Sequence, residues 1–222
     1  MPKSKTKKYQ SIVVVGRKGS GKTYHIAKYL LPELDVKKSR RFLIAPTAFN
    51  DETLSKKFNK ENIFTKFSDD ILDHISKIID EETKELTFKF HHRWNKELEE
   101  YVEIKSRKNK KPKLPPYLLV ADDIMGTDAM KRNGALACFY TLHRHRRTHV
   151  VVVSHSYKHT PVLMRINANR LIIFNQNNSE MKKIMDEHSR EHNSADFISK
   201  FRGATTKDYG TFVIDYYKNP IY

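Results

Sequence analysis

SIVVV at residues 11–15, followed at once by GRKGSGKT at residues 16–23, decides the fold of this 222-residue chain. The run of β-branched residues predicts a buried strand, and residues 23–31 are expected to form a helix that Pro32 ends. The eight-residue string matches the pattern GxxxxGK[ST]. Because it lies between a strand and a helix, which is the required context, we predict a phosphate-binding P-loop here.

The residue types in this loop suit a nucleotide. Glycines let the backbone curl so that successive N–H groups point at a phosphate, and the following helix start adds a partial positive charge. Lys22 should reach the β- and γ-phosphates of ATP, and the Thr23 hydroxyl should bind Mg²⁺. The expected nucleotide-binding residues are Gly16, Arg17, Lys18, Gly19, Ser20, Gly21, Lys22, Thr23 and Tyr24.

A second motif supplies the acidic groups that a P-loop needs. YLLVA at residues 117–121 predicts a strand that runs directly into Asp122 and Asp123. Asp122 is expected to hold Mg²⁺ through water, and Asp123 to orient or deprotonate the water that attacks the γ-phosphate. The alternative is a strand that ends in an Asp-rich turn or helix cap. The pair at residues 69–70 lacks a preceding apolar strand and indicates a helix cap.

Apolar β-rich runs alternate with helical stretches along the rest of the chain, which predicts an α/β fold with a mostly parallel central sheet flanked by helices. The other strands are expected at residues 42–45, 150–154, 170–174 and 211–216, and the other helices at residues 69 to about 103, 129–145 and 179–188. A break in the first of these helices is possible near Thr87.

We expect one P-loop domain over residues 11–222, after a basic, flexible N-terminal tail at residues 1–10. Residues 105–116, with six basic side chains in KSRKNKKPK and then two prolines, are expected to form a solvated loop. Residues 179–222 carry no recognisable motif and should add C-terminal helices and an edge strand.

Composition restricts the class of protein. The chain has 42 Lys and Arg against 26 Asp and Glu, a net charge of +16 and an isoelectric point near 9.7. The single cysteine, Cys138, excludes an internal disulfide framework. No apolar run approaches the roughly 18 residues of a membrane helix, and no apolar stretch of signal-peptide length follows the lysines of residues 1–8. We expect a soluble, intracellular, basic protein with a polyanion as partner.

Three segments after the acidic pair complete a recognisable order of parts. They are LHRHRRTH at residues 142–149 before a predicted strand, HSYKHTP at residues 155–161 after it, and MRIN at residues 164–167. Together with the two motifs above, this order resembles the FtsK–HerA superfamily. It looks most like the genome-packaging ATPases of poxviruses, related large DNA viruses and virophages, over roughly residues 11–174.

The resemblance implies a RecA/FtsK-like P-loop fold and a role for each motif residue. Lys22 and Thr23 match the Walker A lysine and hydroxyl. Asp122 matches the metal-binding acid, and Asp123 matches the catalytic acid, which is Glu in much of the superfamily.

Two further residues take their expected roles only from this resemblance. Arg144 matches the arginine of the family's Arg-His element, a candidate finger that enters a neighbouring subunit's site; a solvated or DNA-facing basic helix end is the alternative. His155 stands where the family usually has the Gln that senses the γ-phosphate. A histidine there can donate one hydrogen bond but is also titratable.

The function that the resemblance implies is an ATP-hydrolysing, Mg²⁺-dependent translocase that packages double-stranded viral DNA into a capsid. It would act as a homo-oligomeric ring, a hexamer or pentamer, with a capsid vertex or portal component as partner. It would be found in the host cytoplasm, at the virus factory, or in the virion. The lysines of residues 105–113 and of the N-terminal tail would be available for sequence-tolerant, salt-sensitive DNA contacts.

Two other functions stay open at this point. A P-loop nucleoside or nucleotide kinase has a similar size, and its lid could be the Arg-rich segment. A nucleotide-gated DNA-binding scaffold with vestigial hydrolysis would explain why His155 departs from the family pattern.

Overall fold

The structure is a computed structural model that describes residues 9–50, 52–108, 112–124, 126–131, 134–189 and 194–217. Contacts divide the chain into two units. One holds residues 1–72 and 116–222, and the other holds residues 73–115. No helix among the described residues is long and apolar enough to cross a membrane.

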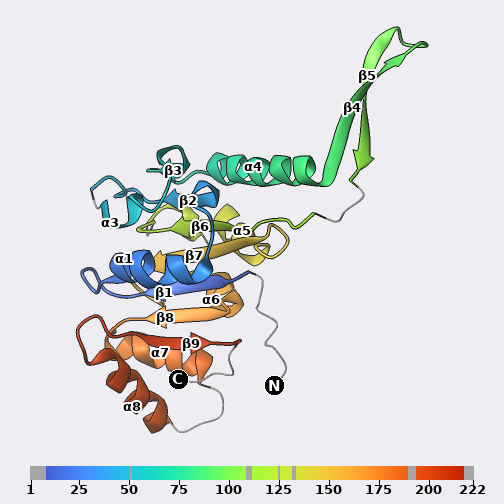
Figure 1. Ribbon diagram of the computed structural model, residues 1–222. Helices are drawn as coiled ribbons and strands as arrows, with labels where there is room; N and C mark the ends of the chain where they lie inside the picture. The colour runs from blue at the N-terminus through green and yellow to red at the C-terminus, as the bar shows by residue number, and fades with distance from the viewer. Residues whose placement is uncertain are drawn as a thin grey trace. The chain divides into compact units, whose positions relative to one another are not determined.

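The first unit is built on a seven-stranded sheet with the strand order β3-β2-β6-β7-β1-β8-β9 (Figure 1). All neighbouring strands are parallel except β8 and β9, which are antiparallel. The predicted α/β fold with a mostly parallel sheet is therefore confirmed. The strands are β1 (Ser11–Val15), β2 (Arg41–Ile44), β3 (Ile63–Phe64), β6 (Tyr117–Ala121), β7 (Thr148–Ser154), β8 (Arg170–Ile173) and β9 (Phe212–Asp215).

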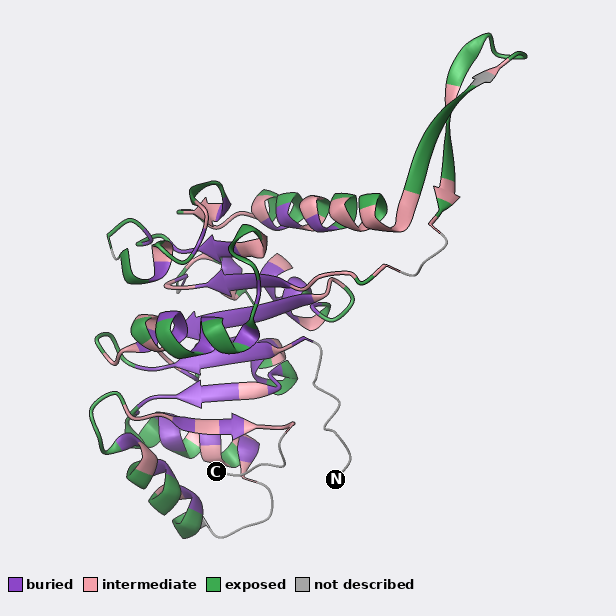
Figure 2. Cartoon of the chain, in the orientation of Figure 1, coloured by how far each residue is buried: buried purple, intermediate pink, exposed green. Residues whose placement is uncertain are grey.

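The three central strands β6, β7 and β1 are buried at every residue, which is why their sequences are continuous apolar runs and do not alternate (Figure 2). Helices cover both faces, and the helix after β1 lies on the opposite face from those that follow β6 and β7 (Figure 1). The helices of this unit are α1 (Lys22–His25), the π-helix η1 (Ile26–Leu30), α2 (Leu31–Leu34), α3 (Glu52–Ser55), α5 (Ala135–Thr141), α6 (Val162–Asn167), α7 (Asn178–His188) and α8 (Ser194–Thr205), with 3₁₀ turns at Lys38–Arg40, Lys60–Asn62 and Asp128–Met130.

The helix that follows the P-loop does not end at Pro32, as the sequence suggested, but continues to Leu34. Its middle is a π-helical segment, in which the Leu31 N–H donates to the Ile26 carbonyl five residues earlier. The wider turn gives Pro32, which has no N–H to donate, a place early in α2 without breaking the helix. Asp35, in the left-handed conformation, ends it.

The helix expected at residues 129–145 is much shorter. A 3₁₀ turn comes first, and α5 begins only after Gly134, which has extended backbone at the N-cap. The helix ends at Thr141, and Arg147 takes a positive φ of 53° before β7 starts. The basic residues of the Arg-rich segment therefore lie in turns.

The second unit corrects the largest error of the sequence analysis. The helix α4 (Asp69–Thr87) starts in the first unit and ends near the expected break, and an antiparallel hairpin follows it in place of more helix. The hairpin strands are β4 (Phe88–Asn95) and β5 (Glu100–Arg107). Phe88, Phe90 and Trp94 fall on alternate-residue positions of β4, a spacing typical of a strand. The Asn95 side chain accepts hydrogen bonds from the turn N–H groups of Glu97 and Leu98.

The basic segment of residues 105–116 is accordingly not all loop, because its first three residues belong to β5. The Lys105 ammonium lies 3.8 Å from the centre of the Phe88 ring on the paired strand. Residues 109–111 of this segment lie outside the described part of the chain.

The expected N-terminal tail also falls largely outside the described part, which begins at Tyr9. Tyr9 is buried, and the backbone N–H of Gln10 donates to His149 Nδ1 at 3.0 Å, so these two residues are fixed to the sheet. At the other end of the chain, α7, α8 and β9 occupy the region that was expected to hold helices and an edge strand.

Candidate active site

The loop of residues 16–21 joins the end of β1 to α1. At two of its positions, Gly16 and Gly21, the structure shows why only glycine fits. A Cβ on Gly16 would lie 2.4 Å from Ser20 Oγ and 2.8 Å from Phe174 Cβ, so no side chain fits there. Gly21 caps α1 with φ 89°, in the left-handed region that glycine adopts without strain. The loop therefore makes the tight turn of a phosphate-binding nest.

Lys22 is the first residue of α1, and its side chain turns back along the loop. Its Nζ donates to the Gly16 carbonyl at 2.6 Å and to the Arg17 carbonyl at 2.9 Å, and lies 3.2 Å from His155 Nδ1. Burial lowers the pKa of Lys22, and the nearby carboxylates of Asp122 and Asp123 oppose this effect. The Lys22 ammonium thus lies against the loop carbonyls and close to the carboxylates of Asp122 and Asp123.

Asp122 and Asp123 directly follow β6. The Asp122 backbone N–H donates to the Ile44 carbonyl at 2.9 Å, which extends the pairing of β6 with β2 by one residue. Burial raises the pKa of the Asp122 carboxyl to about 6, although Lys22 works in the opposite direction. A carboxylate that is buried without full compensation favours a cation beside it. Asp123 has φ 52°, which turns the chain sharply after the strand.

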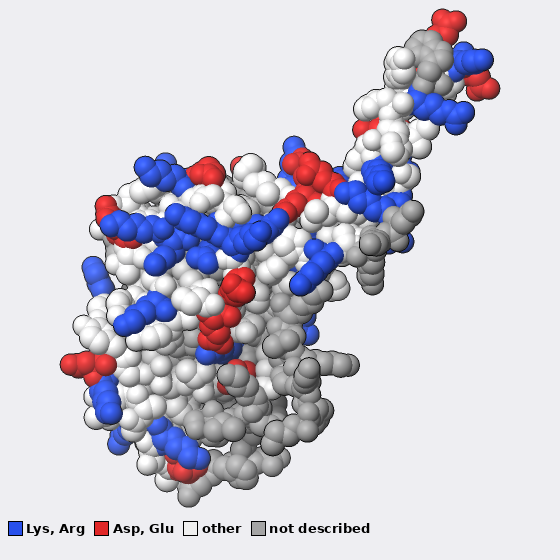
Figure 3. All heavy atoms as spheres, viewed as in Figure 1, with Lys and Arg blue, Asp and Glu red and all other residues white. Residues whose placement is uncertain are grey.

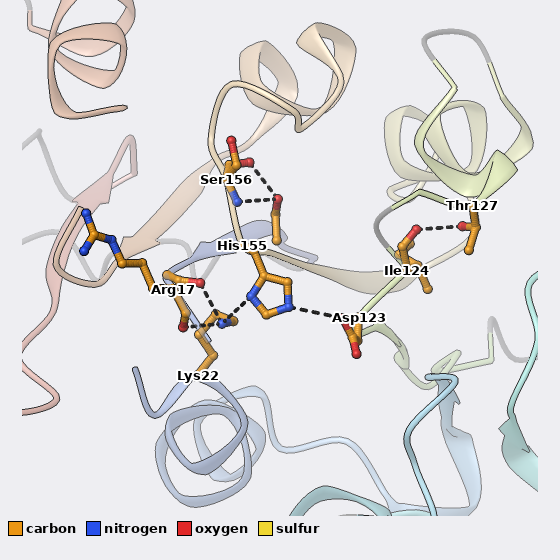
Figure 4. Close-up of polar contacts among 9 residues, drawn as sticks. Arg17, Lys22, Asp123, Ile124, Thr127, His155 and Ser156 are labelled. Atoms are coloured by element: carbon orange, nitrogen blue, oxygen red, sulfur yellow. Dashed lines mark hydrogen bonds and ion pairs between the residues drawn. The ribbon is translucent and has the colours of Figure 1, made fainter. Parts of the chain in front are cut away.

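His155 follows the last residue of β7 and lies between the lysine and the second acid (Figure 4). Its Nδ1 faces Lys22 Nζ, and its Nε2 is 3.1 Å from Asp123 Oδ1. The lysine ammonium has only hydrogens to offer, so Nδ1 accepts and Nε2–H donates to the carboxylate, which assigns the neutral Nε2–H tautomer from the pattern of partners. One imidazole therefore connects the P-loop lysine to the proposed catalytic acid.

These residues surround one hollow of about 440 Å³ at the carboxyl ends of the parallel strands, the edge where ligands bind in open α/β sheets. The hollow brings together most of the predicted site residues. Gly16 and Arg17 do not line it and take part only through their carbonyls, which accept from Lys22. Thr47 and Thr53 line it but carry no sequence signal. Its lining is Lys18, Gly19, Ser20, Gly21, Lys22, Thr23, Tyr24, Thr47, Thr53, Asp122, Asp123 and His155.

Two observations fit this hollow to a magnesium–phosphate group. Ser20 Oγ is buried and has no hydrogen-bond partner among the described residues, so a ligand oxygen can satisfy it. A cation beside Asp122 would stabilise its buried carboxylate, and the Thr23 hydroxyl lines the same hollow. The described residues contain no cluster of three or more His, Cys, Asp or Glu side chains that could hold a metal on their own. Protein sites often hold Mg²⁺ with one or two carboxylates and the substrate's phosphates, and Asp122, Thr23 and a bound nucleotide would form a site of that kind.

Arg144 does not belong to this hollow. It lies in the turn before β7, and the seven residues of β7 separate it from His155 by roughly 20 Å. Its guanidinium donates to the Tyr217 hydroxyl and lies 5.8 Å from the centre of that ring. Arg144 therefore cannot reach the phosphate site of its own chain.

Arg165, in the MRIN segment, is also away from the hollow. Its side chain is almost fully buried, pairs with Glu187 at 3.2 Å and donates to the Tyr157 carbonyl at 3.3 Å. It anchors α7 against α6.

A comparison with protein families matches residues 2–216 to the family described as "Poxvirus A32 protein". The chain belongs to the poxvirus A32 protein family. The match covers nearly the whole chain, both units included. No curated protein matches the sequence of this A32-family chain.

Solved structures resemble the A32-family chain over almost its full length. The genome packaging NTPase B204 from Sulfolobus turreted icosahedral virus 2, in complex with ATP-γ-S, has a TM-score of 0.61 at 16% identity, covering 96% of this chain and 95% of that one. B204, the DNA-packaging ATPase from Sulfolobus turreted icosahedral virus, has a TM-score of 0.59 at 15% identity, covering 96% and 98%. At such identities the likeness shows a shared P-loop fold.

Proposed function

We propose that this chain is the ATP-driven motor of viral genome packaging, a translocase that hydrolyses ATP and moves double-stranded DNA into a capsid. Family membership and the shared fold with packaging ATPases support it. The single observation that carries the enzymatic part is the convergence of Lys22, Asp122, Asp123 and His155 on one hollow.

The chemistry follows from where each group lies. The loop and Lys22 bind the β- and γ-phosphates, and Thr23 and Asp122 would hold Mg²⁺, which neutralises charge on the phosphate oxygens. When a phosphate enters, Lys22 exchanges its contacts with the loop carbonyls and His155 for contacts with phosphate oxygens. Asp123 orients the attacking water and accepts its proton. His155 holds Asp123 in position through the hydrogen bond that its Nε2–H donates to the carboxylate.

Arg144 supports an oligomeric ring. It lies before the amino-terminal end of β7, whereas the P-loop lies at the carboxyl ends of the parallel strands. A catalytic role for Arg144 therefore requires the site of a neighbouring copy. In a head-to-tail ring of five or six copies, each Arg144 would enter the next site and stabilise the charge that develops on the γ-phosphate. Such fingers accelerate phosphoryl transfer by roughly 10³–10⁵.

DNA would contact a basic surface that the sequence analysis did not single out. Residues 37–66 contain eight Lys and Arg but only three Asp and Glu. Figure 3 shows Lys and Arg gathered over the part of the first unit where β2, β3 and α3 lie. We name this the β3-edge surface; its exposed lysines are Lys37, Lys38, Lys56, Lys57, Lys60 and Lys66. Contacts to phosphates through lysines carry no sequence preference and weaken with salt.

The remaining partners and the location follow from this function. A capsid vertex or portal component would receive the DNA, and the protein would act in the host cytoplasm, at the virus factory, or in the virion. The Arg-rich segment cannot serve as the lid of a kinase over this hollow. It precedes β7 and therefore lies at the amino-terminal ends of the strands, whereas the hollow lies at their carboxyl ends.

One assay tests the proposal against both alternatives. Phosphate release from ATP is measured with and without double-stranded DNA, and particle mass is measured in the same buffer. The motor predicts DNA-stimulated turnover by a ring, and Lys22→Ala should abolish it. Turnover that requires a small acceptor would favour a kinase, and nucleotide-dependent DNA binding without turnover would favour a scaffold.

A further inference from the structure

A second hollow adjoins the phosphate site on the other side of the P-loop tip. It measures about 310 Å³ and shares Gly19 and Ser20 with the first hollow. The rest of its wall comes from the end of β8 and the turn between α8 and β9, namely Phe174, Asn175 and residues 205–210. The proposed nucleotide function assigns nothing to this space.

Tyr209 is the unusual residue of this wall. Its ring lies directly over the loop, because a Cβ on Gly21 would be 2.5 Å from Tyr209 Cδ1. The side chain is nevertheless 69% exposed. An aromatic ring that is fixed on a P-loop and open on its other side is a surface on which a planar ligand can stack.

The backbone at Tyr209 is strained, and the turn around it fixes the position of the ring. Tyr209 has φ 62°, a left-handed conformation that is a genuine outlier for a bulky residue. The Gly210 N–H donates to the Lys207 carbonyl at 2.8 Å, and a Cβ on Gly210 would lie 2.4 Å from the Ala204 carbonyl oxygen. The turn is thus closed tightly onto the end of α8. Such strain persists where the surrounding structure enforces it, often at ligand sites.

The strand order also indicates that the base of a bound nucleotide would lie near the second hollow. Asp122, Asp123 and His155 follow β6 and β7, which lie on one side of β1 in the sheet, so the γ-phosphate faces that side. Strands β8 and β9 lie on the other side of β1. A nucleotide whose γ-phosphate meets these acids can extend its base across the loop towards the second hollow.

We propose that Tyr209 is the platform on which the purine base of the nucleotide stacks, with the second hollow as the base pocket. This inference rests on the proposed function, since it assigns the other end of the same ligand. Stacking on an aromatic ring changes base affinity by roughly 5–150-fold. Because every purine offers a flat face, the pocket should accept ATP and GTP with similar gains.

The test compares a ligand that has a base with one that lacks it. Calorimetric titration of Mg²⁺ with ATP, and of Mg²⁺ with inorganic tripolyphosphate, is carried out on the wild type, Tyr209→Ala and Tyr209→Phe without DNA. The control is Tyr101→Ala, which removes a hairpin tyrosine of matching exposure, 68%. Melting temperatures check that each variant is folded.

The proposal predicts that Tyr209→Ala weakens ATP binding about tenfold and leaves tripolyphosphate binding unchanged, while Tyr209→Phe and Tyr101→Ala bind ATP like the wild type. Equal losses for both ligands would show that the ring only supports the loop and would overturn the proposal, as would unchanged ATP binding. If the wild type binds neither ligand, the nucleotide site itself is refuted and the base pocket with it.

Discussion

Replacing Asp122 with Asn should make the nucleotide-free protein more stable while it destroys the active site. The carboxyl lies next to Lys22, yet burial raises its pKa to about 6 from an ordinary value of 3.8. At neutral pH the folded protein therefore holds a carboxylate that would be better solvated in the unfolded chain. An asparagine of the same shape carries no charge to desolvate and can still accept from the Asp123 N–H.

The size of the effect follows from proton linkage. Two pKa units correspond to about 3 kcal/mol. Because the pKa is raised on folding, the favourable contribution of the protonated carboxyl is complete below pH 4 and is lost as the pH rises through 6. Asp122→Asn should therefore gain about 3 kcal/mol at pH 8 and about half as much at pH 5.

The assay is urea unfolding of wild type and variant at pH 5 and pH 8, with EDTA and without nucleotide. Asp186→Asn, which alters an exposed aspartate of α7, is the control and should change the free energy of unfolding by less than about 0.5 kcal/mol at either pH. Mg²⁺ with ATP should then stabilise the wild type but not Asp122→Asn. A variant that is no more stable than the wild type at pH 8, or whose gain in stability does not depend on pH, would show that burial of the Asp122 carboxylate does not destabilise the folded protein.

Substitutions at three further positions test other parts of the proposed mechanism. Asp123→Asn should bind ATP with near wild-type affinity but release no phosphate, because the water loses its base; turnover at the wild-type rate would remove Asp123 from catalysis. His155→Gln should keep more phosphate-release activity than His155→Ala, since the amide still offers a donor to Asp123, and equal losses would contradict a positioning role. Arg144→Ala, mixed with wild type, should depress turnover more than dilution predicts, whereas a purely proportional loss would show that the arginine does not act in a neighbouring subunit.

The sequence predicted those parts of the fold that depend on local signals. Buried parallel strands read as apolar runs, and the glycines of the P-loop follow one of them, so both motifs and the sheet edge at which they meet could be identified. Asp122 and His155 come together because β6 and β7 are neighbours in the sheet. The expected place of His155 came from the family resemblance and not from its local sequence.

Other features depended on the tertiary structure. The residues from Phe88 onwards contain apolar positions compatible with a helix as well as with a strand, and pairing with β5 decided in favour of the hairpin. The π-turn that accommodates Pro32 has no sequence signature. Thr47 and Tyr209 line the two hollows from turns and Thr53 from α3, all distant in sequence from the motifs, so spacing could not have placed them there.

Phosphate release by the wild type and Lys22→Ala, each with and without double-stranded DNA, tests the central claim most directly. A packaging motor should show Mg²⁺-dependent ATP turnover that rises with DNA, loses its stimulation at high salt, and disappears in Lys22→Ala. Turnover that is indifferent to DNA, or that persists without Lys22, would contradict it.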